Sequence, residues 1–194
     1  MKKLIAIFIL KLWGWKIKGK KAPDKKLMIV VMPHTSNWDF PIGILVRWKM
    51  EMKIKFVGKS SLFKPPYGFI MRALGGYPVE RNPTKKKESV VEQIIDIINS
   101  EDEIRITFTP EGTRKKVKRL RSGFYTIAKA TGIKIQLVAI DYHSKTVVFD
   151  IPHTPAETYE EELSILKKFY TGYKGKYPDK TFDFNDIDFK KYLT

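Results

Sequence analysis

The stretch "LMIVVMPHTSNWDFPIGILVRWK", residues 27–49, joins an apolar run to a helical pattern through a short polar turn. The run 27–32 has no polar alternation, which is typical of a strand that is buried on both faces of a sheet. Several residues that cap helices follow it, and Pro41 is tolerated only in the first turn of a helix. We therefore predict a strand, a turn and a helix that begins near Trp38.

The rest of the chain repeats this alternation of apolar runs and helical patterns. Further strands are predicted over 54–58, 77–79, 104–108, 135–140 and 146–151. Helices are predicted near 40–50, 61–74, 84–99, 122–131 and 158–171. Asn82-Pro83 is a reasonable helix start, and Gly132 is a reasonable helix stop. The pattern indicates an α/β fold, a mostly parallel sheet flanked by helices on both faces.

Length and charge limit the class of protein. The chain has 194 residues, 43% of them hydrophobic, which is enough for one domain with one sizeable core. Lys and Arg outnumber Asp and Glu by 37 to 21, so an anionic partner is favoured: nucleic acid, an acidic membrane surface or a phosphorylated substrate. The absence of cysteine excludes disulfides, thiolate zinc sites and a cysteine nucleophile.

The first segment, "MKKLIAIFILKLWGWKIKGKK", is apolar between flanking lysines. A bilayer-spanning helix needs roughly 20 apolar residues, so this run is too short. Its tryptophans and lysines suit the membrane interface, although a helix that covers the core of the domain would also be apolar. We predict a membrane-interface helix over 1–20 and a single domain over 21–194.

His34 stands five residues before Asp39. Residues five apart in a helix lie about 140° apart around its axis, so the two side chains can meet only across a turn. A carboxylate bonded to one ring nitrogen fixes the tautomer and leaves the other nitrogen free to act as a base. The alternative is that Asp39 caps the helix and His34 is an ordinary loop histidine.

A second polar motif, "FTPEGTRKKVKRLRSG" (108–123), follows another strand. Ligands of parallel sheets bind beyond the carboxyl ends of the strands, so we expect His34 and Glu111 to line one crevice. Gly112 lets the backbone approach a ligand, and Arg114 offers a planar fork for a phosphate. The basic residues that follow form either a solvated face or a site for lipid head groups, coenzyme A phosphates or an acidic carrier protein: Lys115, Lys116, Lys118, Arg119 and Arg121.

Taken together, these motifs resemble the glycerolipid acyltransferase family, typified by 1-acylglycerol-3-phosphate acyltransferase. The first block of the family, a histidine, four residues and an aspartate, matches His34 to Asp39. The second block matches Gly76 to Arg81, with Glu80 where aspartate is more usual. The third block, phenylalanine, two residues and Glu-Gly-Thr-Arg, matches 108–114. The resemblance covers residues 27 to 140.

The resemblance implies direct acyl transfer from a thioester of coenzyme A or acyl carrier protein to the hydroxyl of a lysophospholipid. His34 would be the base and Asp39 would orient it. The acceptor's phosphate would be bound by Arg81 and Arg114, in a pocket that is shaped by Glu111, Gly112 and Thr113. No bound cofactor or metal is implied, and the protein would sit peripherally on the cytoplasmic face of the membrane.

The fourth block of the family departs from the pattern. "IQLVAI" has Gln136 and Ala139 where prolines are usual, and prolines there would shape the wall of the acyl pocket. The acceptor could therefore be 1-acylglycerol-3-phosphate, which we favour, or another lysolipid such as an amino-acid lipid or lysophosphatidylethanolamine. A basic nucleic-acid-binding module is a further alternative, but no nucleic-acid-binding signature accompanies the spread positive charge, so no nucleic-acid partner is expected.

Overall fold

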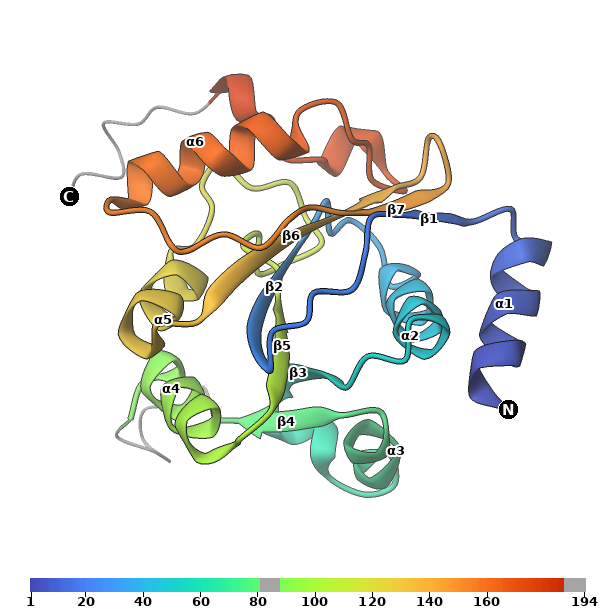
Figure 1. Cartoon of the computed structure of the whole chain (residues 1–194), viewed down its shortest axis with the longest axis horizontal. Helices are drawn as coiled ribbons and strands as arrows, with labels where there is room; N and C mark the ends of the chain where they lie inside the picture. The colour runs from blue at the N-terminus through green and yellow to red at the C-terminus, as the bar shows by residue number, and fades with distance from the viewer. Residues whose placement is uncertain (81–87, 187–194) are drawn as a thin grey trace.

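The computed structural model describes residues 1–80 and 88–186, which form an α/β sandwich around one seven-stranded sheet (Figure 1). The strand order is β1-β7-β6-β2-β5-β3-β4. Every neighbouring pair is parallel except β6 and β7, which are antiparallel. The strands are β1 (Lys16–Lys18), β2 (Lys26–Met32), β3 (Ile54–Lys59), β4 (Gly76–Val79), β5 (Ile104–Phe108), β6 (Lys134–Asp141) and β7 (Thr146–Phe149).

Helices cover both faces of the sheet, as predicted. The α-helices are α1 (Lys2–Leu12), α2 (Asp39–Lys49), α3 (Gly68–Ala73), α4 (Val90–Ser100), α5 (Gly123–Thr131) and α6 (Tyr159–Tyr170). Short 3-10 helices are η1 (Ser60–Phe63), η2 (Pro178–Lys180) and η3 (Phe184–Asp186). Buried side chains of α4, α5 and α6 share one core cluster, and those of α1 and α2 share the other. Figure 1 shows these two layers on opposite sides of the strands.

Three local elements differ from the prediction. The expected helix over 61–74 is split into η1 and α3, because Pro65 and Pro66 lack the N–H that a continuous helix needs. The helix predicted over 84–99 begins at Val90, where Ser89 forms a capping box. Its suggested start at Asn82-Pro83 lies outside the described residues. The short strand β1 was not predicted.

Residues 1–20, predicted as a membrane-interface segment, supply both α1 and β1. Ala6 and Leu10 of α1 are fully buried against α2, so one face of this helix belongs to the core. The other face carries exposed apolar side chains, with Leu4, Phe8 and Leu12 each about 70% exposed. One face of α1 therefore covers the core, which was the alternative interpretation of this segment, and contact of the exposed apolar face with a membrane stays a prediction. Among the described residues, none of the helices is long and apolar enough to cross a bilayer.

Candidate active site

His34 lies in the turn between β2 and α2, at the carboxyl end of a central strand. The ladder of β2 ends at Met32, and Pro33 cannot extend it because proline has no N–H. The helix α2 begins at Asp39, as the sequence predicted within one residue. The backbone N–H groups of Thr35 and Ser36 donate to Asp39 Oδ2 at 3.1 and 3.0 Å, so this carboxylate holds the turn closed.

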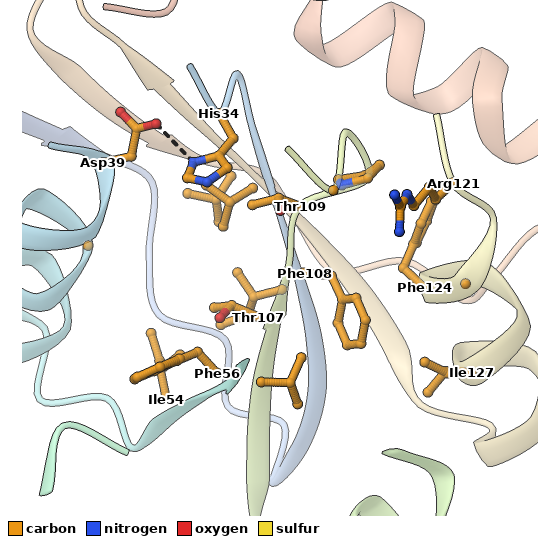
Figure 2. Close-up of a pocket in the computed structure, with 18 of the residues that line it drawn as sticks. His34, Asp39, Ile54, Phe56, Thr107, Phe108, Thr109, Arg121, Phe124 and Ile127 are labelled. Atoms are coloured by element: carbon orange, nitrogen blue, oxygen red, sulfur yellow. Dashed lines mark hydrogen bonds and ion pairs between the residues drawn. The ribbon is translucent and has the colours of Figure 1, made fainter. Parts of the chain in front are cut away.

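The same carboxylate orients the histidine. Nδ1 of His34 lies 2.9 Å from Asp39 Oδ2, an interaction that Figure 2 shows at the head of the pocket. The Asp39 side chain is nearly buried, whereas one fifth of the His34 side chain is exposed. An ionised carboxylate accepts only, so Nδ1 carries the proton and Nε2 is free to accept one. The arrangement is that of a general base.

Tyr142 contacts the His34–Asp39 pair and was missed by the sequence analysis. Tyr142 lies in the connection between β6 and β7, 103 residues from Asp39 along the chain. Its hydroxyl donates to Asp39 Oδ1 at 2.7 Å. The Trp15 ring packs edge-on against the Tyr142 ring at 5.0 Å and fixes its position. Burial, together with the hydrogen bond to Asp39, raises the pKa of Tyr142, so this hydroxyl keeps its proton.

Glu111 lies next to the turn that holds His34. Its Oε1 accepts the backbone N–H of His34 at 2.9 Å, so the two residues lie close together, but only His34 lines the cavity and the predicted shared crevice is not formed by Glu111. The side chain is 3% exposed, and Oε2 has no hydrogen-bond partner among the described residues. Burial raises the pKa of Glu111 to about 7. The carboxyl group therefore supports the His34 backbone from inside the fold.

The loop after β5 carries two arginines, of which Arg121 lines the cavity and Arg114 does not. Gly112 has φ +64°, and a Cβ there would lie 2.7 Å from Arg121 Nε, so the guanidinium of Arg121 packs on this glycine. Arg121 lines the pocket next to Phe124, on the side away from His34 (Figure 2), but the sequence analysis had assigned it to the basic run. Arg114 is exposed and, like Thr113, is not part of the pocket lining. Arg81 lies outside the described residues.

A cavity of about 1060 Å³ opens beside His34 and Asp39. In Figure 2 the histidine and aspartate lie at one end, with Ile54 and Phe56 toward one side and Phe108, Phe124 and Ile127 toward the other. Its walls are largely apolar and include α2, where Gly43 leaves open space. A base at the head of a large apolar cavity suits a reaction at the polar end of a long hydrocarbon substrate. The described part of the chain contains no group of three or more acidic or histidine side chains that could hold a metal ion.

The two residues that stand where the fourth block usually has prolines do not line the cavity. Gln136 and Ala139 are fully buried in β6, and neither lines the pocket, whereas Val138 and Ile140 do. The Gln136 amide Nε2 instead donates to the Asp150 carbonyl at 2.8 Å and holds the segment that leaves β7. The expectation that this position shapes the acyl pocket wall is therefore wrong for Gln136, because its side chain turns toward the β7 side of the sheet.

Comparisons with known proteins agree with this geometry. The family model described as Acyltransferase matches residues 15–141, more than half of the chain. Among solved structures, the 1-acyl-sn-glycerophosphate (LPA) acyltransferase PlsC from Thermotoga maritima is similar at a TM-score of 0.58 and 16% identity. The match covers 86% of this chain and 74% of that one, and at this identity it shows a shared fold. No curated protein sequence matches the chain.

Proposed function

Because the chain belongs to the glycerolipid acyltransferase family, we propose that it transfers a fatty acyl chain from a thioester to the hydroxyl of a lysophospholipid, most simply 1-acylglycerol-3-phosphate. The single observation that carries the proposal is the His34–Asp39 pair at the head of the apolar cavity. The donor is the thioester of coenzyme A or of acyl carrier protein, and the site works at a membrane surface.

The reaction needs one base and no covalent enzyme intermediate. His34 Nε2 takes the proton of the acceptor hydroxyl while the oxygen attacks the thioester carbonyl carbon. The tetrahedral intermediate collapses as the C–S bond breaks, and the departing thiolate receives the proton from the imidazolium. Asp39 stabilises that imidazolium and keeps the ring oriented, while Tyr142 and two backbone N–H groups keep Asp39 in place.

Substrate binding divides between the apolar walls and the basic loop. The acyl chain occupies the apolar part of the cavity, where Ile54 and Phe56 offer hydrocarbon surface. The acceptor's phosphate is bound by arginines of the loop after β5, where Arg114 supplies an exposed fork and Arg121 faces the cavity. Arg81, which ends the second motif, is assigned to the same phosphate by resemblance.

The test is acyl transfer by the purified protein. Labelled acyl-coenzyme A and acyl carrier protein should be offered with a panel of lysolipids, including 1-acylglycerol-3-phosphate, lysophosphatidylethanolamine and an amino-acid lysolipid. We expect a new ester on the phosphate-monoester acceptor and none with the His34→Ala variant. Transfer to a neutral or zwitterionic lysolipid instead would change the acceptor, and donor hydrolysis without transfer to any lipid would overturn the proposal.

A further inference from the structure

The connection between β3 and β4 exposes an unusual amount of apolar surface. We call Leu62, Tyr67, Phe69 and Ile70 the η1–α3 patch. These side chains are 55%, 67%, 74% and 40% exposed, although they lie within nine consecutive residues. Contiguous apolar surface of this kind on a folded domain marks an interaction site rather than ordinary surface composition.

The segment is held firmly enough to present that surface. Phe63 is the buried anchor: its ring faces Gly58 and Gly76, where an added Cβ would lie 3.1 and 2.7 Å from ring carbons. Gly68, which begins α3, packs directly on the Phe63 backbone. One aromatic ring thus fastens the turn to the sheet, and the four patch residues remain outside.

The charged residues along this segment of the chain favour an anionic partner for the patch. Between Glu51 and Glu80 every charged residue is basic, and these residues are Lys53, Lys55, Lys59, Lys64 and Arg72. Lys59, Lys64 and Arg72 are exposed beside the patch. A second copy of this chain would bring like charges together, whereas an anionic lipid surface complements them. The outer face of α1 likewise exposes apolar side chains, and the charged residues within this helix are all basic, although Lys3 is paired with Glu51.

The patch also begins at the sheet edge that carries the chemistry. Strands β2, β5 and β3 are parallel neighbours, so Ser60 leaves β3 at the same edge where His34 leaves β2 and Thr109 leaves β5. We propose that the η1–α3 patch is a second membrane-contact site, which docks the catalytic edge on an anionic bilayer together with α1. The role of the contact in docking the catalytic edge rests on the proposed function. The choice of an anionic bilayer as the partner rests on the exposed apolar side chains and the basic charges.

The chain offers a clean probe because it has no cysteine. Ala73 is exposed and lies one helical turn after Phe69, so the Ala73→Cys variant can carry an environment-sensitive fluorophore on the face of the patch. Ile151 is the matched control position, since it is 82% exposed but lies beyond β7, which runs antiparallel to β6 and ends at the opposite edge of the sheet. Vesicles of phosphatidylcholine with and without phosphatidylglycerol are the ligands.

With anionic vesicles, we expect the emission of the fluorophore at position 73 to shift to the blue and the fluorophore to be protected from an aqueous quencher. A fluorophore at position 151 should show neither change. Replacing both Leu62 and Phe69 by Ser should weaken partitioning into these vesicles by about tenfold or more, whereas Ile151→Ser should change it by less than about twofold. Lys64→Gln should weaken it by about fivefold. Thermal melting of each variant establishes that it is folded.

Several results would overturn the inference. One is vesicle binding by the whole protein with no response at position 73, because α1 alone would then make the contact. Another is a response at position 73 to an acidic acyl carrier protein but not to vesicles, which would make the patch a protein-docking surface. Failure of the proposed function is separate: it would appear as intact vesicle binding without acyl transfer to a monomeric short-chain acceptor.

Discussion

Glu111 should make the stability of this protein fall as the pH rises from about 4.5 to about 7. Its carboxyl group is buried, Oε2 has no hydrogen-bond partner within residues 1–80 and 88–186, and burial raises the pKa from 4.5 to about 7. Below about pH 4.5 the group is protonated in both the folded and the unfolded chain, so it contributes no pH dependence. Between these two pKa values the unfolded chain releases the proton while the folded chain keeps it, which favours unfolding.

The size of the effect follows from the shift. At about 1.4 kcal/mol per pH unit, the rise to about 7 corresponds to about 3 kcal/mol of stability lost by about pH 8. Glu111→Gln keeps an acceptor for the His34 N–H but cannot titrate. Its amide nitrogen meets the same lack of partners, which costs roughly 1–3 kcal/mol at every pH. The slope of stability against pH, not its value at one pH, is therefore the quantity to compare.

Urea denaturation at a series of pH values measures this slope, provided that both proteins show the same m-value. The wild-type protein should lose about 3 kcal/mol relative to Glu111→Gln between about pH 4.5 and pH 8. Glu51→Gln is the matched control: Glu51 is exposed and its hydrogen bond to Lys3 lowers its pKa, so its contribution changes only below about pH 4.5 and the substitution should leave the slope between about pH 4.5 and pH 8 unchanged. Parallel curves for wild type and Glu111→Gln, or a wild-type gain as pH rises, would refute the reasoning.

Four other substitutions test the site. His34→Ala should lower kcat by about 10²- to 10⁴-fold without a change in melting temperature; near-normal turnover would remove His34 from the mechanism. Tyr142→Phe should lower kcat by about tenfold with little change in KM, because Asp39 loses a hydrogen bond that holds it against His34; an unchanged kcat would leave Tyr142 a packing residue. Gly43→Leu should lower kcat/KM by about tenfold or more for the longest accepted acyl chain and spare short ones, because its Cβ enters open cavity; equal losses for all chains would contradict this. Arg114→Lys should raise the acceptor KM by about ten- to a hundredfold with little change in the donor KM, and a lowered melting temperature with both KM values raised would indicate a structural arginine.

The best sequence predictions concern contacts that are close along the chain. The meeting of His34 and Asp39 follows from a strand end, a turn and a helix start within six residues, and the same turn residues supply the N–H donors that hold Asp39. His34 and Glu111 are 77 residues apart, yet their proximity follows from the rule that parallel strands bring their carboxyl ends to one edge of a sheet. The rule did not show that Glu111 is buried behind the turn instead of lining the cavity.

Other features had no such rule. His153 has no acid five residues after it, and the structure pairs its Nε2 with Oε1 of the fully buried Glu162 at 2.9 Å, away from the cavity. The strand β1 is only three residues long and alternates between lysine and isoleucine, so it has no apolar run to detect. It forms because its backbone pairs in parallel with β7.

By itself the sequence determined the alternation of strands and helices, the His34–Asp39 turn and the arginine-bearing loop after β5, because each depends on local geometry and on the periodicity of apolar side chains. Only the tertiary structure decided that Tyr142 binds Asp39, that Glu111 faces inward and that Arg121 rather than Arg114 lines the cavity. Those contacts depend on strand order and on the antiparallel return of β7, which set distances between residues that no pattern along the chain relates.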